Sequence, residues 1–327
     1  MMDMFNNLDP AVRTVIVVLA ILVVLCLLLY LLRMWWQGGQ YTKNTRIDGK
    51  VVIITGGNAG IGKETAIDLA KRGGKIYIAC RDLNRGQNAQ AEIKEISGSD
   101  NVHFLQLDLA SMESIREFSR KFHQLENKLH ILINNAGVMA CPKAKTSDGF
   151  ELQLGTNHLG HFLLTNLLLD LLKEAAPSRV VVVSSIMHRI GFIRKNDLMC
   201  EQRYWKWFAY GQSKLSNILF ARELGKRLEG SGVTANSLHP GIVNTELSRN
   251  LDLCTKSCFN PCRIFFKTPI SGAQTQIMLA VDPELDNVTG RYFADCKQRT
   301  PSSAARDDET ALWLWKESER LTCLSMV

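Results

Sequence analysis

The sequence reads Lys50-Val-Val-Ile-Ile-Thr55, then Gly56-Gly-Asn-Ala-Gly60-Ile-Gly62, then Lys63-Glu-Thr-Ala-Ile-Asp-Leu-Ala-Lys71, and these three pieces decide the fold. The first is a short β-branched run, typical of a buried parallel strand. The glycines let the backbone approach a ligand, and the helix that follows offers unpaired N–H groups and a positive dipole end. We therefore predict a diphosphate cradle with contacts at Thr55, Gly56, Gly60, Ile61 and Gly62.

The next predicted strand, Lys75–Cys80, ends beside Arg81. A site that prefers NAD usually has an acidic residue here for the ribose 2′-hydroxyl, whereas a guanidinium suits a 2′-phosphate. The position favours NADP(H), with an ordinary surface arginine as the alternative.

Strands and helices continue to alternate along the chain. We predict a strand over 102–109, a helix over 111–122 with Ser111 as its cap, and a strand over 129–134. Open α/β sheets bind ligands at the carboxyl ends of their strands, where Asp108 and the Asn134-Asn-Ala-Gly137 turn lie. The pattern predicts a doubly wound parallel sheet, with further cofactor contacts at Asp108, Leu109, Asn135, Ala136 and Gly137.

A pair of side chains with acid–base character follows later, at Tyr210 and Lys214. They are four residues apart in a predicted helix over 208–228, so they share one face. An ammonium beside a phenol favours the phenolate, which lets the tyrosine exchange a proton near neutral pH. The spacing alone also fits a core tyrosine beside a surface lysine.

Taken together, the motifs resemble those of the classical short-chain dehydrogenases/reductases over roughly residues 48–300. The matching motifs, in order, are Thr55-Gly-x-x-x-Gly60-Ile-Gly62, Asn134-Asn-Ala-Gly137, Ser184-Ser185, Tyr210-x-x-x-Lys214 and His239-Pro240-Gly241. Within that family the chain looks like the membrane-anchored, NADP-linked retinol dehydrogenases, on stretches such as Leu154-Gly-Thr-Asn-His-Leu-Gly-His-Phe-Leu-Leu-Thr165 and Ser213-Lys-Leu-Ser-Asn-Ile-Leu-Phe220.

The resemblance implies a role for each of these residues. Tyr210 supplies the proton, Lys214 lowers the pKa of the tyrosine and bonds the nicotinamide ribose, and Ser185 orients the substrate oxygen. Asn157, in a helix predicted to begin near Gly149, holds a water in the proton relay. The resemblance also implies that the segment after the sixth strand wraps the nicotinamide end, with contacts at Pro240, Gly241 and Thr245. The sequence alone does not separate Ser184 from Ser185, and His158 and His161 are interpreted as packing or surface residues.

The N-terminal region has the pattern of a membrane anchor. Residues 14–32 carry no charge and are about the ~20 residues that a spanning helix needs. Arg13 and Arg33 flank the run, and Trp35 and Trp36 match an interfacial aromatic belt. Positive charge downstream favours a cytosolic catalytic domain. A sequon at Asn287-Val288-Thr289, interpreted as unused at the head of a strand, would favour a lumenal domain if it were glycosylated.

Composition argues against several kinds of partner and site. The formal charge of +7 comes without a basic–aromatic block, which argues against nucleic acid as a partner. Nine cysteines in a long chain indicate free thiols in a reducing compartment. Cys254, Cys258 and Cys262 recur at four-residue spacing without a histidine, so we expect no metal site; acylation or packing against lipid fits better.

The predicted organisation has five parts: a tail over 1–13, an anchor over 14–36, a polar linker over 37–48, the dinucleotide-binding domain over 49–300, and a C-terminal tail with a helix over 301–327. Residues 245–268 are expected to form a substrate lid, whose Phe259, Ile264, Phe265 and Phe266 suit an apolar substrate or the bilayer surface. A loop that closes the core is the alternative.

We therefore expect a single-pass protein of the endoplasmic reticulum, with mitochondrial membrane or lipid droplet left open, that uses NADP(H) to interconvert retinaldehyde and retinol. A reductase of steroids or fatty aldehydes stays open within the same chemistry. A catalytically idle, NADP(H)-binding membrane scaffold is the alternative from another class, and a homo-oligomer is open.

Overall fold

The computed structural model describes residues 9–247 and 266–324. Its centre is an eight-stranded sheet in the order β3-β2-β1-β4-β5-β6-β7-β8. All neighbouring pairs are parallel except the last, in which β8 turns back on β7. The prediction of a doubly wound parallel sheet is confirmed, with an antiparallel edge hairpin added.

The strands follow the apolar runs of the sequence closely. Their bounds are β1 Val51–Thr55, β2 Lys75–Cys80, β3 Val102–Gln106, β4 Ile131–Asn134, β5 Ser178–Val183, β6 Val233–His239, β7 Tyr292–Ala294 and β8 Lys297–Arg299. In β1 all five residues are buried, because helices cover both faces of the sheet.

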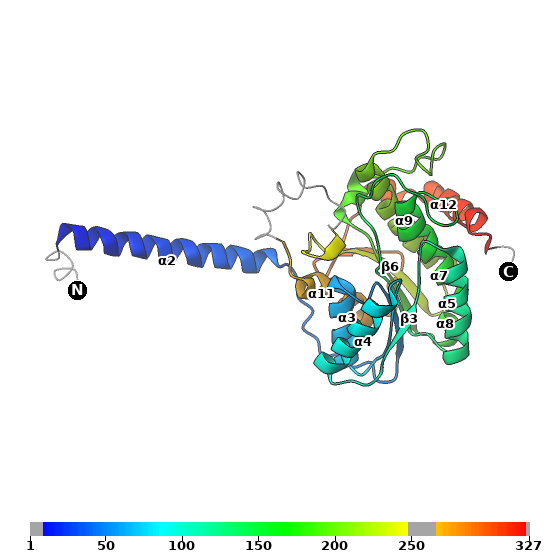
Figure 1. The fold of residues 1–327 in the computed structure, drawn as a ribbon, viewed down its shortest axis with the longest axis horizontal. Coiled ribbons are helices and arrows are strands. Elements are labelled where there is room, and N and C mark those ends of the chain that lie inside the picture. Colours follow the sequence, from blue (N-terminus) through cyan, green and yellow to red (C-terminus); the bar gives the residue numbers. More distant parts are fainter. Residues whose placement is uncertain (1–8, 248–265, 325–327) are drawn as a thin grey trace.

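Helices cover the two faces in separate groups (Figure 1). On one face α3 (Gly60–Lys71), α4 (Leu83–Ser97) and α11 (Pro269–Val281) enclose a core that includes Ile54, Ile78 and Ile277. The other face carries α5 (Met112–Leu125), α7 (Gly160–Leu167), α8 (Leu169–Glu174) and α9 (Lys206–Arg227). The C-terminal α12 (Asp308–Leu321) packs on α9, where Trp315 stacks on Phe220 at 5.9 Å between ring centroids.

Short helical turns complete the described elements. They are α6 Leu152–Leu154, the π-helical turn η1 Gly155–Leu159, and the 3₁₀ turns η2 Ile186–Arg189, η5 Pro283–Leu285 and η6 Ala304–Arg306. The helix expected to begin near Gly149 begins instead at Leu152. Gly149, with φ +86°, turns the chain there, and the Glu151 carboxylate caps the helix by accepting from the amides of Gln153 and Leu154.

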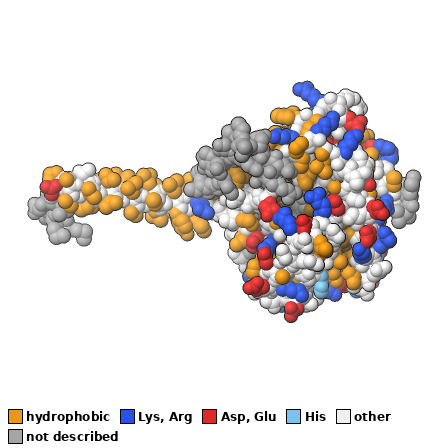
Figure 2. All heavy atoms as spheres, viewed as in Figure 1, with side chains coloured by type: hydrophobic (Ala, Val, Ile, Leu, Met, Phe, Trp, Pro, Cys, Tyr) orange, Lys and Arg blue, Asp and Glu red, His pale blue; other side chains and the backbone are white. Residues whose placement is uncertain are grey.

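The N-terminal helix α2 (Pro10–Trp36) stands away from the domain (Figure 1), and hydrophobic side chains cover it along its length (Figure 2). Its mean hydropathy reaches 3.5, and none of its most apolar window is buried in the protein. A helix of this length and composition suggests membrane anchoring, as the sequence predicts.

Residues 37–48, expected to be a polar linker, lie against the domain. Gln37 and Ile47 are buried there. The sequon differs from its prediction as well: it lies in the loop before β7, which begins only at Tyr292, and the Thr289 hydroxyl accepts from the amide of Ala235 at 3.0 Å.

Candidate active site

A cleft of about 860 Å³ lies at the carboxyl edge of the sheet. Of the predicted cofactor contacts, fourteen line it: Gly56, Gly60, Ile61, Arg81, Asp108, Leu109, Asn135, Ala136, Gly137, Tyr210, Lys214, Pro240, Gly241 and Thr245. Ser185 lines it as well. Thr55, Gly62 and Asn157 do not, and each lies just behind the wall.

The glycine-rich turn leaves room for a ligand at the start of α3. No side chain caps this helix at Ala59, so the backbone amides of its first turn, on the cleft side, have no side-chain hydrogen-bond partner at the cap. Gly56 and Gly60 have φ of +65° and +55°, which favours glycine at both positions. A dinucleotide diphosphate fits this cradle, because uncapped amides and the helix dipole attract an anion.

Gly62 has a packing role. A Cβ at this position would collide with the carbonyl oxygen of Gly56, so the glycine lets the turn close tightly onto the helix. A direct contact between Gly62 and the cofactor stays a prediction.

Thr55 supports the neighbouring turn from behind. The His161 Nδ1 faces the carbonyl of Asn157 at 3.0 Å and must donate, so its Nε2 accepts from the Thr55 hydroxyl at 2.8 Å. The same hydroxyl oxygen accepts from the amides of Asn135 and Ala136, both at 2.9 Å. Burial lowers the pKa of His161 to about 4, which keeps the ring neutral for this arrangement.

Two arginines stand at the open end of the cleft. Arg81 and Arg85 are exposed and line it, and Arg85 forms an ion pair with Glu246 in the loop after β6. That pair connects the start of α4 to the loop across the cleft. The sequence prediction includes Arg81 and misses both partners of this pair, because nothing in the local pattern links residues 161 positions apart.

At the closed end, α9 places Tyr210 and Lys214 side by side. Tyr210 is 3% exposed, and its hydroxyl is hydrogen-bonded to Ser185. Burial raises the pKa of Tyr210 to about 12, and the bond to Ser185 opposes this rise. The phenol is therefore protonated at neutral pH and is ready to donate.

Lys214 lies beside the phenol without a carboxylate partner in the described parts of the chain. Its Nζ is 5.8 Å from the centre of the Tyr210 ring and donates to the carbonyl of Val183 at 3.2 Å. Burial lowers the pKa of Lys214 to about 8. The expected lowering of the tyrosine pKa by this lysine is not seen in the protein alone, where burial dominates the Tyr210 pKa.

Asn157 lies in the π-helical turn η1, a feature often found at functional sites. Its Oδ1 accepts from the amide of Val138 at 2.8 Å, and its Nδ2 donates to the carbonyl of Val138 at 2.9 Å and to the Ser213 hydroxyl at 2.9 Å. The structure therefore makes Asn157 the support of the segment after the Asn-Ala-Gly turn. Its expected water-holding role stays a prediction.

The structure separates the two serines that the sequence could not. The Ser184 hydroxyl is buried and donates to the carbonyl of Lys214 at 2.7 Å, whereas Ser185 is half-buried and meets Tyr210. His239, which was not predicted as a site residue, also lines the cleft. Its Nδ1 accepts from the amide of Ile186 at 3.1 Å, which ties the end of β6 to the turn after Ser185.

The wall around Tyr210 is mainly apolar, with Val138, Met139, Leu152, Ile186, Met187 and Trp207 among its residues. Phe266 also lines the cleft, so the described end of the predicted lid does reach it. Cys254, Cys258, Cys262, Phe259, Ile264 and Phe265 lie outside the described residues. The six cysteines within the described ranges are free thiols.

Comparison with known proteins gives a consistent result. Residues 50–254 match the short chain dehydrogenase family. The chain is 53% identical over 289 residues to retinol dehydrogenase 12 of Mus musculus, covering 88% of this chain and 90% of the relative. It is 49% identical over 300 residues to retinol dehydrogenase 13 of Homo sapiens, covering 90% of this chain and 91% of the relative.

Among solved structures, an uncharacterized protein from Mycobacterium paratuberculosis superposes with a TM-score of 0.71 at 35% identity, covering 87% of this chain and 97% of that one. The glycine cradle, the buried tyrosine–lysine pair and the serine beside it thus occur in a chain that matches the short chain dehydrogenase family model. This protein belongs to the short-chain dehydrogenase family.

Proposed function

We propose that the protein is a membrane-anchored, NADP(H)-dependent oxidoreductase that interconverts retinaldehyde and retinol. The observation that carries the proposal is the group of buried Tyr210 and Lys214 with half-buried Ser185, at the apolar end of a cleft whose other end carries Arg81 and Arg85. The close relatives named as retinol dehydrogenases support the substrate.

The residues divide the work of carbonyl reduction. When bound, the nicotinamide cofactor supplies the hydride. The Ser185 hydroxyl hydrogen-bonds the carbonyl oxygen and holds it beside Tyr210. The Tyr210 phenol gives its proton to that oxygen, and the nearby ammonium of Lys214 stabilises the phenolate left behind. Oxidation of the alcohol uses the same groups in reverse.

Charge at the open end supports NADP(H) over NAD(H). A 2′-phosphate is an anion that guanidinium groups bind with charge-assisted hydrogen bonds, and two arginines line this end of the cleft. Two carboxylates at this end already have partners: Asp82 caps α4 by accepting from the Arg85 amide at 2.9 Å, and Glu246 pairs with Arg85.

For location, we propose the endoplasmic reticulum membrane with the domain in the cytosol. The positive residues after α2 support this orientation. Glycosylation of Asn287 in cells, detected as a mass shift removed by an N-glycosidase, would place the domain in the lumen instead.

The test is reduction of all-trans-retinaldehyde by membranes carrying the protein, with NADPH or NADH supplied. We expect turnover with NADPH that falls at least about a hundredfold in Tyr210→Phe, because the proton donor is lost. Binding of NADPH should persist in that variant.

Tyr204→Phe is the matched control. Tyr204 does not itself line the cleft, and its hydroxyl donates to the carbonyl of Cys141, a lining residue, at 2.7 Å; loss of this one bond should change activity by less than about threefold. Full activity in Tyr210→Phe would overturn the assigned proton donor. Bound NADPH without turnover of any aldehyde would favour the idle scaffold.

A further inference from the structure

The segment Gln37–Asp48, here called the strap, runs along α11 from one edge of the sheet to the other. The Gln37 side chain meets Thr268, the cap of α11; the Tyr41 amide meets Gln274 in its middle at 3.0 Å; and Lys43 meets Asp282 at its end at 2.9 Å. α11 starts at the carboxyl edge of the sheet, where the cleft lies, so the contact of Gln37 with its cap places the end of α2 at that edge. The strap then runs to the opposite, amino edge, where β1 begins.

The junction between α2 and the strap is clamped. Gln37 accepts from the amide of Thr268 at 2.9 Å and donates to the carbonyl of Phe266 at 3.4 Å. The next residues approach the β7–β8 turn so closely that a Cβ at Gly38 would meet Lys267 and Asp295, and one at Gly39 would meet the Asp295 carbonyl. The anchor therefore joins the domain without a flexible hinge.

Gln37 and its two partners, Phe266 and Thr268, here called the clamp, reach the wall of the cleft, because Phe266 lines it. Lys267, between the two Gln37 contacts, donates its amide to the carbonyl of Ile242 at 2.9 Å and accepts from the amide of Asn244 at 3.1 Å. Its side chain is 8% exposed, packs on Gly241 and pairs with Asp295. Gly241, Ile242 and Asn244 all line the cleft.

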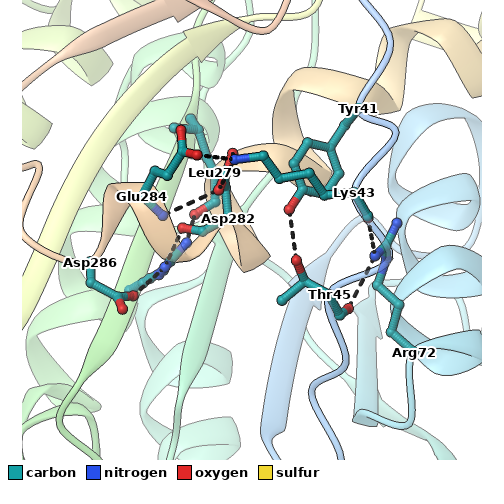
Figure 3. Close-up of polar contacts among 9 residues, drawn as sticks. Tyr41, Lys43, Thr45, Arg72, Leu279, Asp282, Glu284 and Asp286 are labelled. Carbon is teal, nitrogen blue, oxygen red and sulfur yellow. Dashed lines mark hydrogen bonds and ion pairs between the residues drawn. The ribbon is translucent and has the colours of Figure 1, made fainter.

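Polar contacts fix the far end of the strap (Figure 3). Lys43 pairs with Asp282 at 2.9 Å and with Glu284 at 2.7 Å. The Arg72 guanidinium donates to the carbonyls of Lys43 and Thr45 at 2.9 and 3.0 Å. The strap thus has fixed contacts at both ends and behaves as part of the domain.

The length of α2 then sets the depth of the clamp. The charge-free run ends at Leu32, and Gln37 follows Arg33 by four residues, about 6 Å along a helix. The headgroup layer on each side of a bilayer is roughly 5–8 Å thick. With residues 14–32 in the hydrocarbon, the clamp lies at the headgroups, and the carboxyl edge of the sheet, which the clamp contacts, faces the bilayer.

The surface beside the clamp suits that position. Ile242, whose carbonyl accepts from the Lys267 amide, and Ile270, two residues after Thr268, are 53% and 59% exposed. We propose that these isoleucines form a rim that docks on the bilayer holding α2, with the strap as a rigid spacer, so that the cleft takes its lipophilic substrate directly from lipid. The inference rests on the proposed function for its substrate and on the strap for its geometry.

The test uses the full chain in phosphatidylcholine vesicles and two aldehydes, retinaldehyde in the lipid and a short, water-soluble aldehyde. Inserting Gly-Gly-Ser-Gly-Gly-Ser between Trp36 and Gln37 leaves the strap docked but lets the domain move up to about 20 Å from the anchor. We expect the apparent KM for retinaldehyde to rise at least about tenfold, with the KM for the soluble aldehyde within about twofold.

Ile270→Glu tests the rim without touching the cleft lining, and it should raise the retinaldehyde KM about threefold. Ile96→Glu is the matched control, because Ile96 is 52% exposed at the end of α4 on the opposite edge of the sheet. An equal effect of both substitutions would show that added charge, not the position of the rim, matters.

A second measurement does not need turnover. Energy transfer from bound NADPH to an acceptor on lipid headgroups should fall in the insertion variant. Unchanged transfer and an unchanged retinaldehyde KM would overturn the docking. Reduced transfer in a protein that reduces neither aldehyde would keep the docking and reject the proposed function.

Discussion

The two ends of the cleft are built in opposite ways. At the catalytic end Tyr210 and Lys214 are each 3% exposed, and the hydroxyls of Ser184 and Ser213 beside them have fixed partners. At the other end Arg81 and Arg85 are exposed on the surface. Proton transfer requires groups held in place with shifted pKa values, whereas recognition of a phosphate needs only cations within reach.

This difference predicts large, pH-dependent effects at the buried end and smaller, salt-dependent effects at the exposed end. Burial amplifies electrostatic interactions at the first, and water and ions screen them at the second. Three variants test the contrast.

Lys214→Met should have the largest effect, a loss of at least about a hundredfold in kcat, because the phenolate formed at Tyr210 loses its counter-charge. The methionine keeps the volume of the buried stem, and thermal unfolding should show a folded protein. A loss below about threefold would mean that the lysine does not assist the proton donor.

In the unsubstituted protein, burial lowers the pKa of Lys214 to about 8 while it raises that of Tyr210 to about 12. The ammonium is present below pH 8 and is lost as the pH rises through that value. The kcat/KM for NADPH, which reports groups of the free enzyme, should therefore fall above about pH 8. Lys214→Met should abolish this fall in kcat/KM above about pH 8. If the fall persists in the variant, a titratable group other than Lys214 causes it.

Arg81→Ala should raise the KM for NADPH about ten- to thirtyfold and leave that for NADH within about twofold. Charge-assisted hydrogen bonds of about 1.5–3 kcal/mol are lost with the guanidinium. Lys128→Ala, a change of charge away from the cleft lining, serves as the control. Equal losses for the two cofactors would show that Arg81 does not read the 2′-phosphate.

Glu246→Gln should have the smallest effect. It frees Arg85 from an exposed ion pair, and such pairs contribute little to stability. We expect NADPH to bind up to about threefold more tightly at low salt, with the gain gone at high salt. Weaker binding in this variant would indicate that the pair itself closes the cleft.

Much of this site follows from local sequence. The strand, glycine turn and helix over 50–71, the four-residue spacing of Tyr210 and Lys214 and the Ser111 cap are all short-range patterns, and the structure has each element where the pattern puts it. Short-range patterns do not show whether a residue lines the cleft or lies buried behind the residues that line it. Thr55 and Gly62, predicted as cofactor contacts, and Asn157, predicted to hold a relay water, do not line the cleft and lie behind its wall.

For the strap, too, short-range sequence patterns do not reveal the tertiary contacts. Its residues are polar and include two glycines, which is also the composition of a free linker. The partners of Gln37 and Lys43 lie 231 and 239 residues away in the chain, so no local pattern reveals them.

The sequence by itself determined the sheet class, the long apolar N-terminal helix and the chemical groups of the site, because each depends on periodicity or spacing within about thirty residues. Tertiary structure alone decided which serine faces the tyrosine, how burial shifts the pKa values of Tyr210 and Lys214, and which edge of the sheet the anchor meets. Those properties depend on contacts between segments far apart in the chain, and such contacts exist only once the core has packed.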